Sequence, residues 1–355
     1  MSKYLHFVLE YIWIDPHNNI RSKTRIVKKN FSNNVFLNFS DIIMNIWSFD
    51  GSSTGLASTS NSEITLSPVK YVPDPIRSKS FVDTSTNLYH CYVVLCQCLD
   101  SNNLPIDCNS RFDSSLILKS CDSFKPWFGF EQEFVLYDSS SNLPLGWSSS
   151  SGPAPQGNFY CGNGSKFVFG RHIIDQHLRI CLEAGLDICG TNAEVMPGQW
   201  EFQIGPTLGI DAADQLWIAR FFLIRLCEQF NVHVSFNPKP ESSGDWNGSG
   251  LHTNFSCLQS RQDNGIDFIY SLLDKLSKTH KNDLLFYGNN DQRLTGSFET
   301  SDPLTFSFGV GDRSASVRIP LHVAHSKKGY FEDRRPASDA DPYLVSKCLC
   351  SSMFL

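Results

Sequence analysis

Residues 128–137 read FGFEQEFVLY, and the rest of the chain is best interpreted outward from them. Their aromatic and β-branched side chains predict a strand in a buried sheet. Side chains two positions apart on a strand share a face, so Glu131 and Glu133 point the same way. Two adjacent carboxylates in an apolar strand repel each other and resist loss of water. They are therefore either an exposed pair on a wet face or part of a metal site with further ligands elsewhere.

The composition is that of an ordinary globular protein. Of the 355 residues, 41% are hydrophobic and 19% are charged, which allows a sizeable core and two domains. The formal net charge of -6 gives no electrostatic reason to expect nucleic acid or an anionic membrane as a partner. Because no run of roughly 20 apolar residues occurs, we expect no transmembrane helix.

The cysteines indicate a reducing compartment. All 12 are scattered along the chain, and no C-x-x-C spacing occurs. The N-terminal stretch carries His6, Glu10 and Asp15 among its apolar residues, which is unlike a secretory signal. We therefore expect reduced thiols in a cytoplasmic protein.

Strand and turn signals dominate the first hundred residues. Segments 7–14, 21–27, 63–69 and 89–98 are rich in β-branched and aromatic residues and predict strands. The stretch IWSFDGSSTG at 46–55 indicates a strand end that runs into a Gly/Ser-rich loop. These features predict a small β-rich N-terminal domain.

Helical periodicity begins only in the second part of the chain. Segments 171–185, 211–230 and 266–281 carry apolar residues at helical spacing, with short strand-like pieces between them. The whole pattern predicts an α+β fold. We place the N-terminal domain at 1–103 and a larger α+β domain at 104–355.

Further carboxylates and one imidazole recur on short strand-like pieces beside aromatic residues. Glu194 and Glu201 flank a Pro-Gly turn, His252 lies in GLHTNFS, and Glu332 lies in YFEDR. Each residue alone is typical of a loop, a core position or a solvated edge. Together with the pair on the first strand, they can form two adjacent metal sites. Oxygen-rich sites of this kind suit Mg²⁺ or Mn²⁺ better than Zn²⁺, which prefers cysteine and histidine.

Nine motifs recur along nearly the whole length of the chain: EYIWID, FDGSSTG, WFGFEQE, PQGNFYCG, GTNAEVMPGQWEFQIGP, DWNGSGLHTNFS, RLTGSFETS, RSASVRIP and KKGYFEDRRPAS. A single motif of this kind is a weak signal, but nine in the order and spacing of one family make coincidence negligible. The chain thus resembles the eukaryotic-type glutamine synthetases over nearly its whole length.

The resemblance implies ATP-dependent ligation of ammonia to L-glutamate, with γ-glutamyl phosphate as the intermediate. It also implies at least two divalent ions, Mg²⁺ or Mn²⁺, near the reacting groups. One ion would be held by Glu133, Glu194 and Glu201, and the other by Glu131, His252 and Glu332.

The resemblance also assigns residues to the substrates. Arg313, Arg318 and Arg334 match arginines that stabilise the phosphoryl group and its nucleotide, and Arg293 matches one that grips the glutamate α-carboxylate. The residues that match contacts to the glutamate amino acid portion are Asn247 and Gly248, and those that match the ATP pocket are Trp127, Asn254, Ser256 and Tyr330.

A third set of residues matches the ammonia half-reaction. Asp50 matches the carboxylate that binds ammonium and takes its proton, and Ser53 and Tyr160 match the lining of the same pocket. Glu299 matches a glutamate on the flap that closes over the intermediate and excludes water.

The resemblance further implies a β-grasp N-terminal domain and a catalytic domain built on a curved antiparallel sheet flanked by helices. It implies a homo-oligomer, a decamer of two pentameric rings, with each active site between neighbouring subunits. In such an assembly Asp50 would act across a subunit interface.

Several positions depart from the family pattern, and two of them lie beside implied site residues. Phe298 stands where the family has histidine before the flap Glu299, and Asp312 stands where it has asparagine before Arg313. Neither change removes an implied metal ligand. They therefore bear on kinetics and affinity rather than on the reaction itself.

Two other interpretations stay open. The chain could be a relative in the same ligase superfamily that uses another amine or carboxylate, or a catalytically silent structural or regulatory homologue. The complete ammonium pocket speaks against the first, because a larger amine needs a roomier site. The six implied metal ligands speak against the second, because a silent homologue would normally have lost one.

Overall fold

The structure is a computed structural model of the whole chain, residues 1–355. The residues it describes are all except 1–2, 32–37, 149–155, 242–245 and 298–299.

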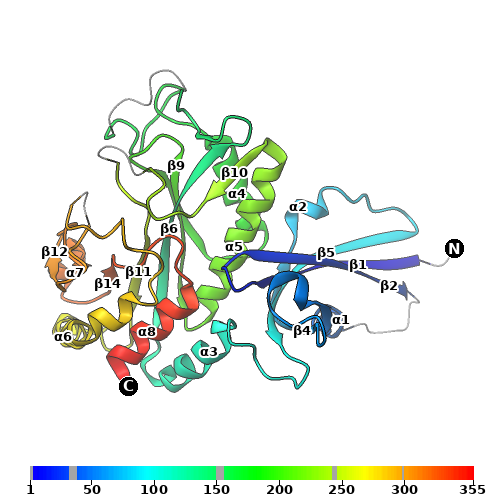
Figure 1. Cartoon of the computed structure of the whole chain (residues 1–355), viewed down its shortest axis with the longest axis horizontal. Helices are drawn as coiled ribbons and strands as arrows, with labels where there is room; N and C mark the ends of the chain where they lie inside the picture. Colours follow the sequence, from blue (N-terminus) through cyan, green and yellow to red (C-terminus); the bar gives the residue numbers. More distant parts are fainter. Residues whose placement is uncertain (1–2, 32–37, 149–155, 242–245, 298–299) are drawn as a thin grey trace. The chain divides into compact units, whose positions relative to one another are not determined.

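The chain divides into two compact units (Figure 1). The first comprises residues 1–113 and 179–186, and the second comprises residues 114–178 and 187–355. The boundary expected after residue 103 stays a prediction.

The first unit contains a five-stranded mixed sheet in the order β2-β1-β5-β4-β3. Its central pair, β1 and β5, is parallel, while the other neighbours are antiparallel. The strands are β1 (Lys3–Ile14), β2 (Ile20–Phe31), β3 (Trp47–Asp50), β4 (Glu63–Pro73) and β5 (Asn87–Leu99). The strands that the sequence predicts here are confirmed.

Side chains at alternate positions of β1 form much of the core of this unit. Leu5, Phe7, Leu9, Tyr11 and Trp13 occupy every second position and are all buried. Side chains at this period share one face of a strand, so one face of β1 is fully apolar. The short helices α1 (Phe39–Ile43) and α2 (Pro75–Ser78) complete the unit, and α1 adds two buried isoleucines to the core.

The second unit is built on a nine-stranded sheet. Its main path runs β12-β13-β14-β11-β6-β9-β8, and both β10 and β7 pair with β6. All pairings are antiparallel except that of β12 with β13. The strands are β6 (Trp127–Asp138), β7 (Leu143–Pro144), β8 (Ile188–Ala193), β9 (Gln199–Leu208), β10 (Val232–Ser235), β11 (Leu251–Ser256), β12 (Phe308–Val310), β13 (Val317–Ile319) and β14 (Phe331–Asp333).

The three helices that the sequence predicts are present as α4, α5 and α6, and the α+β class is confirmed. The other five helices of the described residues, among them the short α1 and α2, carry too weak a periodic signal to be predicted. The helices from α3 onward are α3 (Ser110–Ser120), α4 (Arg171–Glu183), α5 (Asp211–Cys227), α6 (Gly265–Leu284), α7 (Leu321–Ser326) and α8 (Pro342–Phe354). Asp341 caps the N-terminus of α8, because its side chain accepts a hydrogen bond from the backbone N–H of Tyr343 at 2.9 Å.

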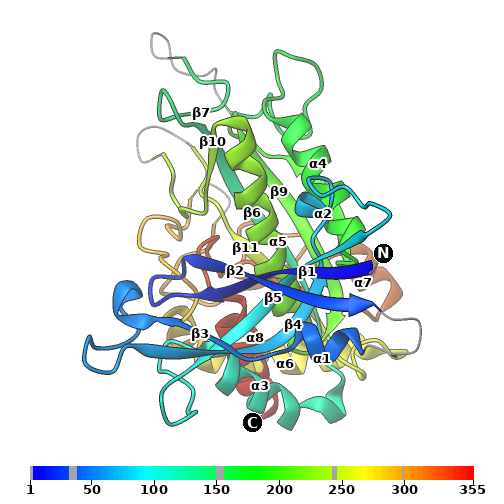
Figure 2. The same ribbon diagram turned by 90° about the vertical axis from the view of Figure 1, so that its right-hand side faces the viewer.

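Helix α5 lies along β6, β9 and β10 (Figure 2). It is buried along almost its whole length. One face of the sheet is therefore closed by an apolar helix, and side chains of β6 that point away from α5 lie on the other face.

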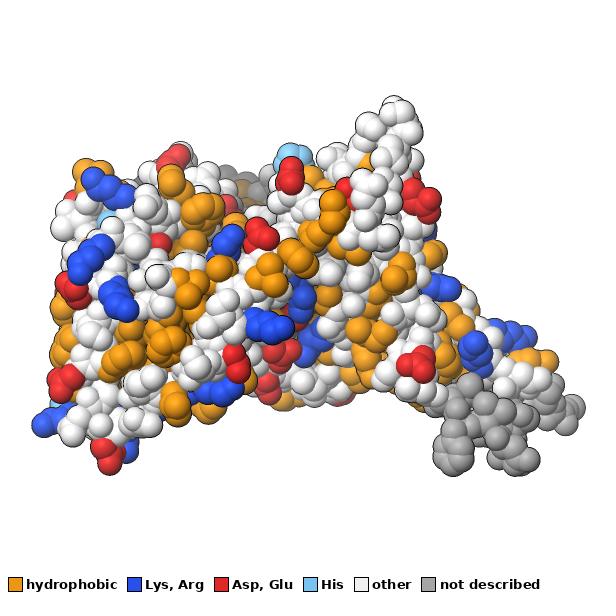
Figure 3. All heavy atoms as spheres, turned by 90° about the horizontal axis from the view of Figure 1, so that it is seen from below, with side chains coloured by type: hydrophobic (Ala, Val, Ile, Leu, Met, Phe, Trp, Pro, Cys, Tyr) orange, Lys and Arg blue, Asp and Glu red, His pale blue; other side chains and the backbone are white. Residues whose placement is uncertain are grey.

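Acidic and basic side chains are interspersed, rather than gathered by sign, on the face shown in Figure 3. In the part of the chain that the structure describes, no helix has the length and apolar character needed to cross a membrane. The 12 cysteines all carry free thiols.

The β1–β2 turn depends on a buried carboxylate. Asp15 is 1% exposed, and it accepts hydrogen bonds from the backbone N–H groups of His17 and Asn19, both at 2.9 Å. Arg21 adds a third bond from Nε at 2.8 Å. Burial alone would raise the pKa of Asp15, but these hydrogen bonds outweigh it and lower the pKa below 3.8.

We predict that Asp15→Ala destabilises the first unit by about 1–3 kcal/mol at neutral pH, because the donors of the turn lose their charged acceptor. Since the folded-state pKa is lowered, this contribution is present above the unfolded pKa of about 4 and is lost as the pH falls through the lower folded value. Thermal unfolding at neutral and acid pH measures it. Asp41→Ala, on the exposed first turn of α1, is the control. An equal effect of both changes would contradict the prediction.

Candidate metal and substrate site

Four ligand candidates are set by strand pairing. On β6, Glu131 and Glu133 share the face opposite α5, and Gln132 between them points toward the helix. On β11, His252 lies directly opposite Glu131, and on β9, Glu201 lies directly opposite Glu133. Directly opposed residues on neighbouring strands project from the same face. The pairing register alone thus gathers three carboxylates and an imidazole.

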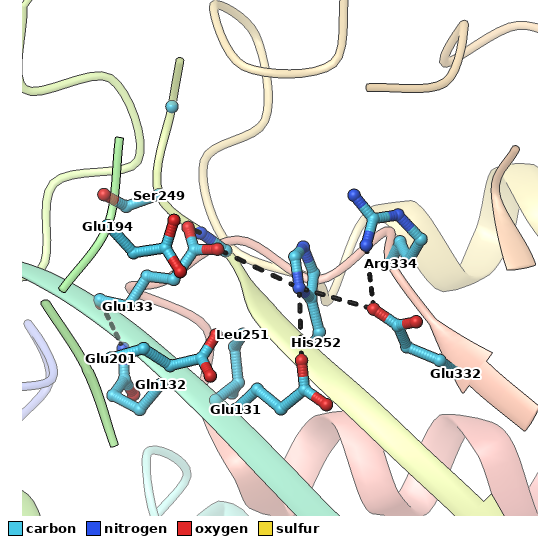
Figure 4. A network of polar contacts seen from close by, with 12 residues as sticks. Glu131, Gln132, Glu133, Glu194, Glu201, Ser249, Leu251, His252, Glu332 and Arg334 are labelled. Carbon is cyan, nitrogen blue, oxygen red and sulfur yellow. Dashed lines mark hydrogen bonds and ion pairs between the residues drawn. The ribbon is translucent and has the colours of Figure 1, made fainter. Parts of the chain in front are cut away.

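The imidazole of His252 lies at the centre of this group (Figure 4). Its Nδ1 atom is 3.6 Å from Glu131 Oε2 and 3.9 Å from Glu133 Oε1. It is 3.5 Å from Oε1 of Glu332, which β14 brings in from the other side of β11. These side chains therefore converge on a common space.

Two overlapping sets of ligand atoms can hold a cation. Glu131, His252 and Glu332 form one set, and Glu133, Glu201 and His252 form the other. Within each set the ligand atoms lie within 4.8 Å of one another. The first set is the one that the sequence predicts.

The second set differs from its prediction. Glu194 is expected there, but among the described residues the close set contains His252 in its place. The Glu194 carboxylate accepts a hydrogen bond from Asn192 Nδ2 at 2.8 Å, and it lines the same small pocket as Glu133. Its role as a ligand stays a prediction.

The buried carboxyl groups resist ionisation. Burial raises the pKa of Glu133 to about 7, even though Arg293 and the backbone N–H of Gly250 favour the ionised form. Burial, with the neighbouring charge of Glu133, raises the pKa of Glu194 to about 8. The pKa of Glu201 is raised well above its ordinary value, first by burial and then by the other carboxylates. A divalent cation would reverse these shifts, so the donor set fits such an ion.

The histidine is suited to the same role. Burial lowers the pKa of His252 well below 6.5, and the cation of Arg334 adds to this effect. The ring is therefore neutral at physiological pH. A neutral imidazole keeps a lone pair that can bind a metal ion.

Arginines surround the far side of the site. Glu332 is fully buried between Arg318, whose Nε donates to its carboxylate, and Arg334, whose Nη1 lies 2.8 Å away. Arg293 donates from Nη2 to the carbonyl of Arg334 at 3.0 Å and from Nη1 to that of Arg335 at 3.1 Å. Although burial lowers the pKa of Arg293 to about 10, it stays charged at neutral pH.

The three residues expected to bind glutamate, Asn247, Gly248 and Arg293, line a small polar pocket beside the carboxylates. Arg313 and Arg334, which are expected to stabilise the phosphoryl group, line the same pocket. The structure thus brings together residues that are almost ninety positions apart in the sequence.

Two glutamines that the sequence analysis passed over hold this pocket together. Gln156 exchanges two hydrogen bonds with Asn247, at 3.0 Å to its backbone N–H and 3.1 Å to its side-chain oxygen. Gln199 donates from Nε2 to the carbonyl of Gly248 at 3.3 Å and to Ser249 Oγ at 3.0 Å. Their signal was their place in the motifs PQGNFYCG and GQWE.

A second, more apolar cavity of about 360 Å³ adjoins Glu131. Four of the five residues expected to contact the nucleotide line it, namely Trp127, Asn254, Ser256 and Tyr330. Asn254 also donates from Nδ2 to Glu131 Oε1 at 2.8 Å, which links the cavity to the carboxylates.

Arg261 is a further residue of this cavity that the sequence analysis missed. Its guanidinium carbon lies 4.2 Å from the ring centroid of Trp127, and its Nη1 donates to Ser256 Oγ at 2.9 Å. A guanidinium over an aromatic ring forms a flat, polarisable wall. A lone arginine in the loop after β11 gives no signal of this in the sequence.

The ammonium-pocket residues fall into three groups. Asp50 and Ser53 belong to the first unit, where Asp50 accepts hydrogen bonds from Ser52 N–H and Ser53 Oγ, both at 3.0 Å. Hydrogen bonds from these serines lower the pKa of Asp50, so it is ionised. Tyr160 belongs to the second unit, where burial and the charge of Glu194 raise its pKa. Glu299, with Phe298, lies outside the described residues.

Comparison with known proteins gives a consistent family. A family model described as "Glutamine synthetase, catalytic domain" matches residues 117–281. The glutamine synthetase of Saccharomyces cerevisiae is 44% identical over 360 residues, which cover 99% of this chain and 92% of the yeast protein. That of Panulirus argus is 46% identical over 351 residues, which cover 97% and 92%.

A solved structure shares the fold. The cryo-EM structure of Plasmodium falciparum glutamine synthetase matches with a TM-score of 0.74 at 18% sequence identity. The match covers 98% of this chain and 71% of that chain.

The raised pKa values predict how the protein responds to a divalent ion. Without a cation, Glu133 and Glu194 keep protons up to about pH 7 and 8, whereas their unfolded pKa is 4.5. Their contribution to stability is therefore present at low pH and is lost as the pH rises through the folded values. Because a bound ion needs the ionised carboxylates, the increase in Tm on adding Mn²⁺ should be larger at about pH 8.5 than at about pH 6.

Differential scanning fluorimetry at the two pH values measures this difference. Glu183→Gln, an exposed change outside the cluster, should behave as the unchanged protein, and Glu133→Gln should reduce the difference. Equal increases in Tm at both pH values would contradict the prediction.

Proposed function

The chain belongs to the glutamine synthetase family, and from this premise we propose that it joins ammonia to L-glutamate through γ-glutamyl phosphate. Members of this family are glutamate–ammonia ligases that use ATP, and this enzyme is one of them. The observation that best supports the proposal is the convergence of the carboxylates and His252 between two pockets, one polar and one apolar. Nitrogen assimilation and ammonia detoxification are the roles that this reaction would serve.

The proposed metal sites divide the carboxylates. Glu131, His252 and Glu332 would hold one divalent ion, and Glu133, Glu194 and Glu201 the other. When bound, Mg²⁺ or Mn²⁺ ions would neutralise charge on the transferring phosphoryl group. Support comes from the two close ligand sets and from the raised pKa values of Glu133 and Glu194, which a nearby cation would lower.

The arginines would act on the substrates. Arg313 and Arg334 line the polar pocket, where their fixed charges would stabilise the phosphoryl group as it moves to the glutamate side chain. Arg293 would grip the α-carboxylate of glutamate, with Asn247 and Gly248 beside it. Because Arg293 is held by backbone carbonyls and Arg334 by Glu332, these two arginines need little reorganisation when the substrate binds.

The nucleotide would occupy the apolar cavity. Trp127 and Tyr330 would contact the base, and Asn254 and Ser256 would position the rest of the nucleotide beside Glu131. Arg318 would then face the phosphates from β13, next to Glu332. The cavity volume of about 360 Å³ is in the range of small-molecule sites.

Ammonium would be captured by an anionic pocket made of Asp50, Ser53, Tyr160 and Glu299. Ionised Asp50 would accept the proton of ammonium and leave ammonia as the nucleophile. Glu299 would help to exclude water while the acyl phosphate exists. We further propose that Asp50 serves the site of a neighbouring subunit, in a homo-oligomer that forms a decamer of two pentameric rings in the cytoplasm.

We predict ATP-dependent glutamine formation from glutamate and ammonium with Mg²⁺ or Mn²⁺. The purified full-length protein is assayed for glutamine, with methylamine as the competing acceptor. Glutamine formation with little use of methylamine supports the proposal. Preference for methylamine would favour a ligase for another amine, and no product with any metal would favour a silent homologue.

The proposed division of the ligands between two ions predicts different effects for substitutions at Glu131 and Glu133. Glu131→Gln should chiefly raise the KM for ATP, whereas Glu133→Gln should chiefly impair the glutamate and ammonia steps. We expect each effect to be at least about 10-fold, the size seen when metal sites lose a supporting group. Steady-state kinetics measure both, with Glu183→Gln as the control. Equal damage to both steps from each change would count against the proposed division.

A further inference from the structure

A fully buried arginine lies on the rear of the sheet, behind the candidate metal site. Arg220, on α5, donates from Nε to Gln132 Oε1 at 2.7 Å. It donates from Nη2 to the carbonyls of Ser338 and Ala340, both at 3.1 Å. Its guanidinium also lies over the rings of Trp217 and Phe236. The described hydrogen-bond acceptors are thus all neutral.

A buried charge without a bonded carboxylate is costly, because burial removes its water. Burial does lower the pKa of Arg220 to about 10, yet the side chain stays charged at neutral pH. An apolar residue of similar size would fill the same space without this cost. The planar fork of arginine offers something that an apolar residue lacks, namely several hydrogen bonds in fixed directions.

One route from this guanidinium leads to Glu133 along β6. Gln132 is fully buried, and its Oε1 accepts the bond from Arg220. Its Nε2 donates to the backbone carbonyl of Glu133 at 2.8 Å and to that of Ser338 at 3.0 Å. The residue before Glu133 is therefore fixed in position by Arg220.

A second route reaches the same residue through the loop before β11. The carbonyl of Ser338 accepts a hydrogen bond from Arg220. The backbone N–H of Ser338 in turn donates to the carbonyl of Ser249 at 3.1 Å. The next residue, Gly250, donates its N–H to Glu133 Oε2 at 2.7 Å. The backbone and the carboxylate of Glu133 are thus tied to one guanidinium by separate paths.

We propose that Arg220 is a positioning residue that sets the place of the Glu133 carboxylate in the metal site from the opposite face of the sheet. This inference rests on the proposed function, because it needs Glu133 to be a metal ligand. Glu332 is held differently, by Arg318 and Arg334 on its own face. Loss of Arg220 should therefore weaken the site that contains Glu133 and spare the site that contains Glu332.

The test is a Mn²⁺ titration of the full-length protein, with free Mn²⁺ followed by electron paramagnetic resonance. We expect the unchanged protein to bind two ions with separable affinities. Arg220→Lys keeps the charge but loses the planar fork of hydrogen-bond donors. It should lower the affinity for one ion by about 10-fold, as the loss of a group that supports a metal ligand does. Its titration should match that of Glu133→Gln and not that of Glu332→Gln. The KM for glutamate should rise, while the KM for ATP should stay unchanged.

A core substitution on the same helix separates positioning from general loss of stability. Leu226→Ala removes a buried side chain of α5 and should lower Tm without changing either Mn²⁺ affinity. Where Arg220→Lys yields little folded protein, Gln132→Met breaks the first route alone and should show the same selective loss. Far-ultraviolet circular dichroism confirms folding at the temperature of each titration.

The outcomes distinguish this inference from the proposed function. Failure of the unchanged protein to bind Mn²⁺ would overturn the proposed metal sites themselves. Binding of two ions by the unchanged protein, with the same affinities in Arg220→Lys, would overturn the inference alone. An equal loss of affinity for both ions in Arg220→Lys would also overturn the inference, because the effect would then not pass through Glu133.

Discussion

In the second unit, strand pairing crowds several carboxylates onto one face of the sheet, and the candidate site depends on this arrangement. Pairing of β6 with β9 and β11 forces Glu131, Glu133, Glu201 and His252 onto one face within a few ångströms. Such a cluster is unfavourable in an apolar sheet, and the raised pKa values of Glu133 and Glu201 express that cost. The fold keeps the arrangement because strand register fixes it. A one-residue slip of β6 would turn both glutamates toward α5.

Positive charge is distributed so that the cluster is not simply neutralised. Arg318 and Arg334 bond to Glu332 at one edge, and Arg293 is turned toward backbone carbonyls. The carboxylates at the centre keep no arginine bonded to them among the described residues. They remain available to a cation, while the arginines face the space where an anionic substrate would lie. This separation of charges is what phosphoryl transfer needs, since it depends mostly on positioning and on electrostatic stabilisation.

Much of this could be predicted from sequence because the signals are local. The spacing of Glu131 and Glu133 fixes their common face through the strand period of two, and helical periodicity located α4, α5 and α6. The tertiary partners carry no such signal. Arg261 meets Trp127 across more than 130 residues, and the position of Glu194 at the end of β8 depends on how that strand stops. Helix α8 is apolar nearly all round, so it shows no amphipathic stripe.

The two faces of β6 illustrate how one strand can serve two demands. The front face must hold charge in water-accessible pockets, while the rear face must exclude water against α5. An ordinary apolar residue between Glu131 and Glu133 would pack well but would leave the strand free to shift along the helix. Gln132 and Arg220 replace that packing with directed hydrogen bonds, which tolerate much less displacement than apolar contacts do. The rear of the sheet thus supplies the precision that the front of the sheet requires.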